Sequence, residues 1–456
     1  MFGNLHAHSK LSDDVTNAGD DMLPIAAFRY AHQHGLDFLA ISDHHKADDS
    51  PHSLGMQPAE YKSKLYDIAV SYSATNEDGF VAIPAIEWGN TATGNHLNLV
   101  GLRNLPPATI HDEDYDQIYV WGKDNAEFIV LNHPNSWSGK SNRNQHVGNF
   151  GENLFSDVNA FAARAGSVTR GISIITTVSG GHISGAFKHN TDKTHREQQW
   201  EKYYNQFLNK GFHISPSADQ DTHWKNWGTV TAARTAVWAD KPTYAELMKG
   251  FQANRIYATE DDELVVAYQA RYANKTYWMG DTVPLQASEA DVDLIVKIWQ
   301  SNGSDGDATD EGPYTVELIS DDDGIGGHEA SVEFTKPHVA SGQAVTIPHR
   351  ATAGGYIYLR ITEENGKDNP IGDGTDEFNN TTGAHQPDGK RDNLNDSAWT
   401  SPIWFSGGAE MFVWSAAPSA KVFHDATCWA AKRIGTANRR SGPQPPPDRT
   451  KHDCHE

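Results

Sequence analysis

Residues 2–8 read Phe-Gly-Asn-Leu-His-Ala-His, so a short apolar strand runs directly into two histidines. The same arrangement recurs through the first half of the chain, where apolar runs border histidines and acids. These polar positions are Asp13, Asp43 and His44, Glu87, His96, His133, His182, and Asp219, Asp221 and His223. Imidazole and carboxylate groups are ligands of zinc, manganese and iron. Folding alone would favour apolar residues where strands end, so the recurrence indicates a metal site.

The apolar runs also predict the fold. Up to about residue 260 they alternate with helical or irregular segments, and strands that are apolar on both faces predict a parallel sheet. Polar residues at the carboxyl ends of such strands are typical of a closed α/β barrel. From about residue 264, alternating runs predict antiparallel strands and a β-sandwich. We therefore expect an α/β chain with a barrel at 1–262, a β-sandwich at 263–415, and a linker with a small tail at 416–456.

Composition limits the classes of function. A chain of 456 residues predicts two or three domains. No stretch approaches the roughly 20 apolar residues of a membrane span. The net charge of −23 argues against a generally basic surface that coats nucleic acid. It does not exclude a nuclease, because bound divalent cations supply local positive charge. Because an apolar strand begins at Phe2, we expect a removed leader and a secreted or periplasmic protein.

The spacing of the polar residues predicts more than one metal ion. His6 and His8 are two residues apart on an extended segment, so both side chains project to the same side. Asp221 and His223 repeat this spacing, and the two oxygens of Glu87 allow it to bridge two ions. These residues exceed what one ion needs, so we expect two or three divalent ions about 3.5–4 Å apart that share a bridging hydroxide.

Together, these positions resemble the PHP superfamily, named for polymerase and histidinol phosphatase domains. The resemblance covers about residues 2–260 and implies a distorted (β/α)7 barrel with up to three metal ions. The matching elements are His6 and His8, Ser12 with Asp13, Ser42 to His44, Glu87, His96, His133, and Asp221 with His223. Asp14 stands where the family has glycine, which leaves open which aspartate coordinates, and Asp13 is favoured.

The resemblance also implies how the ligands are shared. The first ion would have His6, His8, Glu87 and Asp221, the second Asp13, His44 and His223, and the third Glu87, His96 and His133. Finer motifs at 218–223 and 398–404 resemble a secreted branch of the superfamily that is related to carbaryl hydrolases. Members of that branch carry an appended β-sandwich.

The tail is similar to the zinc domains of Ada-type alkylation-repair proteins, which are also appended to some secreted nucleases. A structural zinc ion would have His424, Cys428 and Cys454, with His455 or His452 as a further ligand. A Cys428–Cys454 disulfide and simple disorder are the alternatives, because the second half of the pattern fits poorly.

Three further residues are candidates for catalytic roles. Asp43 is predicted to orient His6 or His8 without binding metal itself. His182 follows a strand and either touches substrate or is an ordinary loop histidine. Arg234 either clamps an anionic oxygen or forms an ordinary salt bridge.

The leading hypothesis is a metal-dependent phosphoesterase in which the bridging hydroxide attacks phosphorus. Its substrate would be a phosphodiester, including DNA or RNA, or a small phosphomonoester. The main alternative is an esterase, carbamate hydrolase or amide hydrolase that uses the same site. A catalytically inactive scaffold with binding modules is the third hypothesis.

Overall fold

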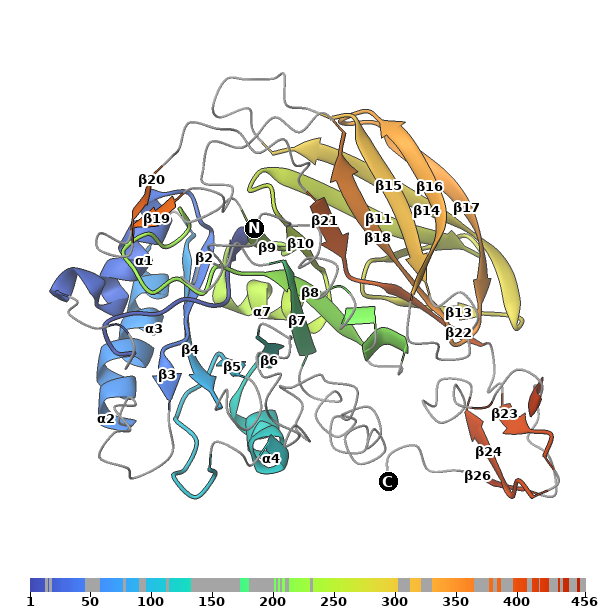
Figure 1. Ribbon diagram of the computed structural model, residues 1–456, viewed down its shortest axis with the longest axis horizontal. Coiled ribbons are helices and arrows are strands. Elements are labelled where there is room, and N and C mark those ends of the chain that lie inside the picture. The colour runs from blue at the N-terminus through green and yellow to red at the C-terminus, as the bar shows by residue number, and fades with distance from the viewer. Residues whose placement is uncertain are drawn as a thin grey trace.

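The structure is a computed structural model, and most of the chain is described in it. The described residues are 1–12, 15, 19–45, 58–76, 79–89, 96–111, 115–132, 173–179, 201, 204–205, 207–209, 213–229, 233–301, 312–320, 330–364, 377–379, 384–386, 397–407, 412–417, 419–425, 434, 438–442 and 449–451. Figure 1 shows an N-terminal half that combines strands with helices, a strand-rich body beside it, and a small group of strands near the C-terminus.

The N-terminal half contains short strands and a few helices. Its strands are β1 (Phe2–Asn4), β2 (Phe38–Ile41), β3 (His44–His45), β4 (Val81–Trp88), β5 (Leu97–Val100), β6 (Phe128–Leu131), β7 (Ser173–Ser179), β8 (Ile214–Ala218), β9 (Arg234–Val237) and β10 (Ile256–Thr259). Its helical segments are η1 (Asp20–Met22), α1 (Pro24–Gln33), α2 (Pro58–Glu60), η2 (Tyr61–Tyr66), α3 (Asp67–Thr75), α4 (Tyr115–Asn125) and α7 (Tyr244–Gln252).

The sheet of this half is mixed, whereas the sequence predicts a parallel one. β1, β2 and β4 are parallel to one another, as are β6, β7 and β8. β5 is antiparallel to both of its neighbours, and β9 is antiparallel to β1 and β10. β4 and β5 are separated only by residues 89–96, and a parallel pair needs a crossover of roughly a dozen residues or more. The chain therefore turns back on itself here.

The two ends of this sheet approach each other. Thr235 on β9 exchanges hydrogen bonds of 3.1 Å with the backbone N–H and carbonyl of Ala218 on β8. A backbone ladder that would join β8 to β9 or β10 is not among the strand pairs of the described residues. The closed (β/α)7 barrel therefore stays a prediction, and the architecture that is established is mixed α/β with a large sheet.

Strands dominate the second half of the chain. They are β11 (Leu264–Tyr272), β12 (Lys275–Trp278), β13 (Thr282–Leu285), β14 (Glu289–Gln300), β15 (Tyr314–Ser320), β16 (Ser331–Val339), β17 (Ala344–Thr352), β18 (Tyr356–Glu363), β21 (Ser397–Thr400) and β22 (Ile403–Gly407). A separate pair is β19 (Glu377–Asn379) and β20 (Ala384–Gln386), and the tail has β23 (Phe412–Ser415), β24 (Val422–Asp425), β25 (Arg439–Gly442) and β26 (Thr450–Lys451).

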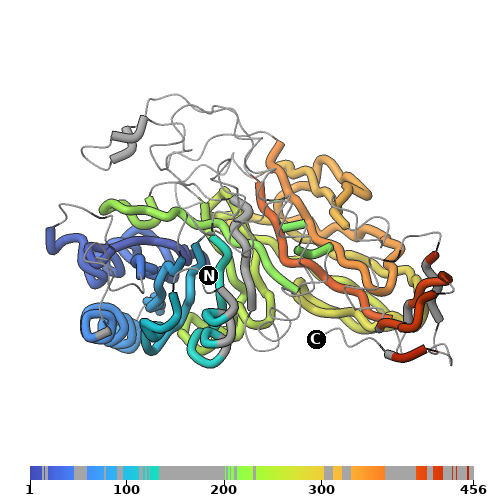
Figure 2. Tube along the Cα trace, turned by 60° about the horizontal axis from the view of Figure 1, so that its bottom comes forward, coloured from blue at the N-terminus to red at the C-terminus, as the bar shows by residue number. Residues whose placement is uncertain are grey.

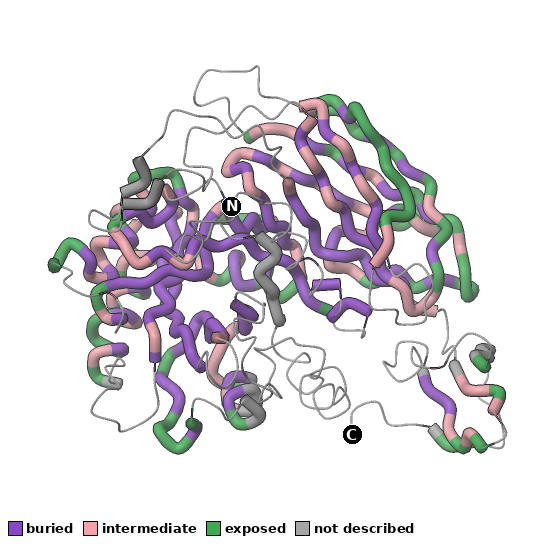
Figure 3. Tube along the Cα trace, in the orientation of Figure 1, coloured by how far each residue is buried: buried purple, intermediate pink, exposed green. Residues whose placement is uncertain are grey.

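The strands β11–β18, β21 and β22 form two sheets around a shared apolar core, and we call them the sheet pair. Alternate residues of β14, such as Leu294 and Val296, are buried, and they belong to the same core as Leu359 and Ile361 of β18. Figure 3 shows this alternation as a change from buried to exposed along the strands. The alternating pattern in the sequence predicts this arrangement, because successive side chains of a strand point to opposite faces.

The two halves share one sheet. β10 pairs with β21 in antiparallel fashion, so the sheet of the N-terminal half continues into the sheet pair. Figures 1 and 2 show the two bodies side by side from two directions. Buried polar contacts reinforce the junction: Glu201 accepts hydrogen bonds from Tyr358 and Arg360, both of 2.7 Å. Among the described residues, no helix is long and apolar enough to cross a membrane.

Candidate metal centre

The segment that follows β1 places two imidazoles on one side of the backbone. Leu5 and Ala7 are buried in the apolar core, and His6 and His8 alternate with them. The backbone is held on both sides, because Ala7 accepts from Ser42 N–H at 2.8 Å and His8 N–H donates to Thr222 at 2.9 Å. The predicted common direction of His6 and His8 is therefore explained by an extended segment fixed between two neighbours.

The strand that leads to this segment depends on Gly3. Gly3 lies opposite Phe38 in the parallel ladder between β1 and β2. A side chain at Gly3 would collide with the backbone and ring of Phe38. Glycine is thus required for the close approach of two strands whose ends carry His6 and Asp43.

Glu87 lies at the centre of the cluster, and its two oxygens face different histidines. Oε2 is 3.1 Å from His6 Nε2, 3.2 Å from His8 Nε2 and 3.5 Å from His44 Nδ1. Oε1 is 2.9 Å from His96 Nδ1. The side chain of Glu87 is almost fully buried, so this division is imposed by the surrounding strands. A carboxylate placed in this way can bridge two cations.

Asp221 contacts the same two imidazoles. Its Oδ1 is 3.1 Å from His6 Nε2 and 2.9 Å from His8 Nε2. The backbone of Asp221 has φ 47°, a left-handed conformation that is unfavourable for most residues. Its N–H donates to the carbonyl of His6 at 2.9 Å, which holds the residue in this conformation. Strain of this kind is typical of functional sites.

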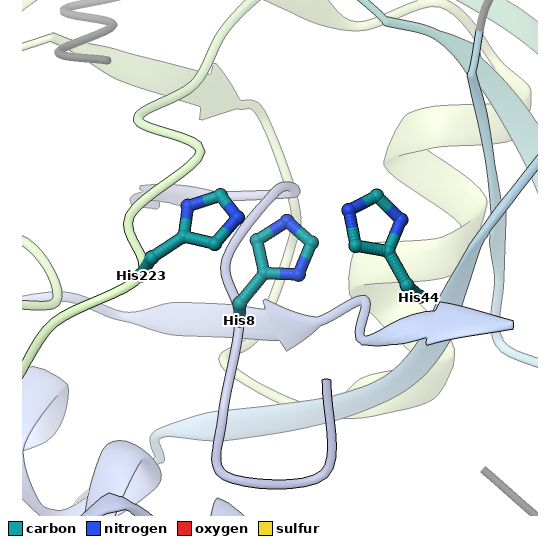
Figure 4. A group of neighbouring side chains, drawn as sticks. All are labelled: His8, His44 and His223. Carbon is teal, nitrogen blue, oxygen red and sulfur yellow. The ribbon is translucent and has the colours of Figure 1, made fainter. Parts of the chain in front are cut away.

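His8, His44 and His223 form a second group. Figure 4 shows the three rings side by side, from the segment after β1, from β3 and from the segment after β8. The ring centroids of His8 and His223 are 4.0 Å apart, and those of His8 and His44 are 4.8 Å apart. His223 Nδ1 also lies 2.9 Å from the carbonyl oxygen of Asp221.

The described residues thus contain three overlapping groups of ligand atoms, each with all atoms within 4.8 Å of one another. The groups are His6, His8, Glu87 and Asp221; His8, His44 and His223; and His44, Glu87 and His96. The first group equals the first ligand set implied by the sequence. The second group contains His44 and His223 of the second set, with His8 added. The third group contains Glu87 and His96 of the third set, with His44 added.

The imidazoles and carboxylates of the cluster shift one another's pKa. Burial lowers the pKa of His6, but Asp221 and Glu87 outweigh burial and raise that pKa to about 10. The pKa of His8 is raised well above its usual value, because the same two carboxylates outweigh burial. Burial would raise the pKa of Asp221, but the two imidazoles hold it well below its usual range. The imidazoles and carboxylates thus interact strongly, and a divalent cation bound here would take the place of the imidazole protons.

Two buried aspartates hold the backbone around the His6–His8 segment. The Asp43 carboxylate accepts from the Ser9 N–H at 2.5 Å and from the Ser9 hydroxyl at 2.7 Å. The Asp219 carboxylate accepts from the Leu5 N–H at 2.6 Å. The role of Asp43 in orienting the ring of His6 or His8 stays a prediction. The contacts of Asp43 with Ser9 fix the residue that directly follows His8.

Arg234 is buried and makes local contacts. Its guanidinium donates to the carbonyl of Ala233 at 2.9 Å and to the carbonyl of Gly228 at 2.8 Å, and it forms an ion pair with Asp262 at 3.2 Å. The salt bridge that the sequence offered as the alternative is therefore present. The role of Arg234 as an anion clamp stays a prediction.

Several predicted residues lie outside the described part of the chain. These are Asp13, Asp14, His133 and His182 in the N-terminal half, and Cys428, His452, Cys454 and His455 in the tail. His424 is described and is buried on β24. The zinc, disulfide and disorder alternatives for the tail all stay predictions.

The pattern of the sequence predicts no role for Asn98 or Asn132 and includes Asp219 only as one of the recurring polar positions. Asn132 Nδ2 donates to Glu87 Oε1 at 2.9 Å, and Asn98 Nδ2 donates to the carbonyl of Leu5 at 2.9 Å. The position of Asn98 was the signal in the sequence that could have identified it. Asn98 follows His96 by two residues on an extended strand, so both side chains lie on the same side of the sheet.

Comparisons with known proteins give only distant similarity. No protein-family model matches the chain, and no curated protein matches it significantly. The chain is similar to a two-domain protein from Bacteroides vulgatus that contains a predicted PHP-like metal-dependent phosphoesterase, with 12% identity, a TM-score of 0.40, and coverage of 80% of this chain and 90% of that one. It is also similar to a lesion-specific endonuclease from Pyrococcus furiosus, with 13% identity, a TM-score of 0.31 and coverage of 55% of each chain.

Proposed function

We propose that this protein is a metal-dependent phosphoesterase of the PHP type. The observation that carries the proposal is the division of Glu87 between two groups of imidazoles, with Asp221 facing the first of them. A shared carboxylate among histidines is what a site for adjacent divalent ions requires.

The ligand atoms fit a cation. Ligands about 2.0–2.2 Å from a tetrahedral zinc ion lie about 3.4 Å from one another. The nitrogens of His6 and His8 lie 2.9–3.2 Å from the facing oxygens of Glu87 and Asp221. The set therefore needs little expansion to surround an ion. Nitrogen and oxygen donors together suit zinc, manganese or iron.

The cluster has a buried floor and a more open rim. The side chains of His6, His8 and Glu87 are 4%, 0% and 1% exposed, whereas those of His44, His96 and His223 are 13%, 14% and 21% exposed. Substrate would reach the site from the rim, and the floor residues would fix the positions of the ions. Burial keeps the electrostatic interactions of this floor strong, because water screens them little.

The proposed reaction is hydrolysis of a phosphodiester or phosphomonoester. Bound divalent ions would supply an ionised water and neutralise negative charge on the phosphoryl oxygens. Glu87 and Asp221 would keep their negative charge and orient the ligand sphere. His44, His96 and His223 would line the side on which the phosphoryl group arrives. Nucleic acid belongs to the proposed substrates, and the resemblance seen in the sequence is the support for it.

Metal removal and a small substrate panel test the proposal. Protein stripped with a chelator is reloaded separately with Zn²⁺, Mn²⁺ or Fe²⁺, and metal content is measured alongside hydrolysis of bis-nitrophenyl phosphate, nitrophenyl phosphate and nitrophenyl acetate. We expect phosphoester hydrolysis that disappears on chelation and returns with metal. Strong hydrolysis of the acetate without phosphoester hydrolysis would replace the proposal with the carboxylic ester alternative.

A matched pair of variants separates the site from the rest of the chain. His8→Ala removes a floor imidazole, and we expect loss of metal and of turnover. His338→Ala removes an imidazole that pairs with Glu364 at the surface of the sheet pair, and we expect no change in either quantity. Equal turnover in both variants would contradict a reaction at this site.

A further inference from the structure

Two buried asparagines connect the strands that carry the candidate ligands. Asn98 lies on β5 and Asn132 directly follows β6, and they are 0% and 1% exposed. Asn132 Nδ2 donates to Glu87 Oε1 at 2.9 Å and to Asn98 Oδ1 at 2.7 Å. Asn98 Nδ2 donates to the carbonyl oxygen of Leu5 at 2.9 Å. The chain of hydrogen bonds therefore runs from the backbone before His6 to the carboxylate of Glu87.

The direction of every amide in this chain is fixed by its neighbours. A backbone carbonyl can only accept, so Asn98 must present its NH2 group to Leu5. Its Oδ1 then faces Asn132 and can only accept, so Asn132 must donate from its own NH2 group. The same NH2 group donates to Glu87, whose ionised carboxylate can only accept. A reversed amide at either position would place two acceptors against each other in a buried site.

This arrangement determines where the two oxygens of Glu87 point. Oε1 receives the Asn132 amide on one side and lies 2.9 Å from His96 Nδ1 on the other. Oε2 faces His6 and His8 instead. Without the amide, rotation about the last bond of the Glu87 side chain would meet less resistance, since that torsion is broad.

We propose that Asn132 and Asn98 are positioning residues, which direct Oε1 of Glu87 toward His96 so that the carboxylate is shared between two ion sites. The proposal rests on the metal centre of the proposed function, but not on the bond that is hydrolysed. It predicts a selective defect. Loss of the amide should weaken the ion on the His96 side, while the set formed by His6, His8 and Asp221 keeps its ion.

Metal titration of chelator-stripped protein provides the test. Zn²⁺ binding to wild type, Asn132→Ala and Asn98→Ala is followed by calorimetry, and bound zinc is counted after gel filtration. For Asn132→Ala we expect the weaker class of sites to lose roughly 10- to 100-fold in affinity, the range typical for groups that orient metal ligands, and the tightest site to stay within about threefold. Asn98→Ala acts through Asn132, so we expect a change of the same kind that is smaller.

Asn209→Ala is the matched control. Asn209 is also a buried asparagine, but it accepts a hydrogen bond from Tyr356 at the junction with the sheet pair. We expect lower thermal stability in this variant with an unchanged number of bound zinc ions. Near-UV circular dichroism confirms that each variant is folded, and Asn98→Ala keeps the test open if Asn132→Ala does not fold.

Activity provides a second readout, because excess metal should restore kcat of Asn132→Ala if the amide acts by holding an ion site. Unchanged zinc binding in both asparagine variants would overturn the proposal. Equal weakening of every ion would also overturn it, since that is the result of a general loss of structure. Selective zinc loss in a protein without phosphoesterase activity would keep the positioning role and reject the proposed function. A wild-type chain that binds no zinc, manganese or iron would reject both.

Discussion

Glu87 and Glu364 each hold a histidine, but they do so in opposite settings. Glu87 is buried in the N-terminal half among imidazoles that are themselves mostly buried. Glu364 pairs with His338 at 2.6 Å, and that histidine is 79% exposed at the surface of the sheet pair. Surface pairs contribute about 1 kcal/mol or less to stability, whereas burial of charged groups costs several kcal/mol before pairing repays it. Stability alone explains the second pair and does not explain the first.

The same contrast extends to the strands that carry these residues. In the sheet pair, the inward positions of β14 are apolar from Ala290 to Ile298, and charge lies on the outward positions. In the N-terminal half, apolar strands end in buried carboxylates and imidazoles, and Asp221 adopts an unfavourable backbone conformation. The sheet pair thus follows the pattern expected for stability, whereas the strand ends of the N-terminal half carry buried charge that the proposed metal centre would account for.

The largest expected effect comes from neutralising the shared carboxylate. Glu87→Gln removes the negative charge that faces both groups of imidazoles, so we expect loss of bound metal and a fall in turnover of roughly 10³-fold, which is about 4 kcal/mol of transition-state stabilisation. Glu364→Gln is the matched control, with metal content and turnover unchanged. Metal analysis and initial rates measure both. Equal loss of metal and turnover in Glu87→Gln and Glu364→Gln would contradict the contrast between the halves.

A smaller effect, confined to stability, is expected in the core of the sheet pair. Leu294→Ala removes a fully buried side chain and leaves a cavity, so we expect the free energy of unfolding to fall by about 2–5 kcal/mol. Metal bound per folded molecule should not change. Thr346→Ala on the exposed side of β17 serves as control, with a change below about 0.5 kcal/mol. Loss of metal in Leu294→Ala would show that the halves are energetically coupled through their common sheet.

The smallest effect concerns the junction between the halves. Burial raises the pKa of Asp261 to about 6, from 3.8 for an unburied aspartate. The folded state therefore binds a proton between pH 6 and pH 4 that the unfolded state does not bind, so this residue adds stability as the pH falls through that window. The contribution is at most about 3 kcal/mol, and it is absent above pH 6.

Asp261→Asn isolates this contribution. The Asp261 carboxylate accepts from Gln300 Nε2 at 2.7 Å, and Gln300 Oε1 has no hydrogen-bond partner among the described residues. A flip of the Gln300 amide would therefore let its oxygen accept from the new asparagine. We expect the variant to gain stability relative to wild type at pH 7 and to lose that advantage near pH 4, as measured by thermal unfolding. A difference in stability that does not depend on pH would contradict the raised pKa.

Local pattern predicted a large part of this molecule. The alternation along β14 and the apolar runs of β2 and β6 were recognisable from the sequence. Burial of one strand face requires apolar residues at alternate positions, and burial of both faces requires a continuous apolar run. His6 and His8 were expected to share one side of the backbone for the same reason. The direction of β5 was not predicted, although residues 89–96 are too few for the crossover that a parallel pair needs.

The same distinction between local pattern and long-range packing applies to the candidate site. Histidines and acids beside apolar runs were sufficient to select His6, His8, His44, Glu87, His96, Asp221 and His223, which the structure brings together. The supporting roles of Asn98 and Asn132 were missed, and Asp219 was predicted only as one of the recurring polar positions. Their partners are distant in sequence, and a buried asparagine has no pattern that separates support of a site from support of a strand.

The sequence by itself determined which side chains are available for chemistry and at which strand ends they occur, since strand periodicity and residue type are local properties. Only the tertiary structure decided that Glu87 divides its oxygens, that Asp43 holds Ser9, and that one sheet joins both halves. Those outcomes depend on contacts between segments as far apart as His8 and Asp221, which are 213 residues apart along the chain. Such contacts form only when the whole chain packs, so no local sequence pattern predicts them.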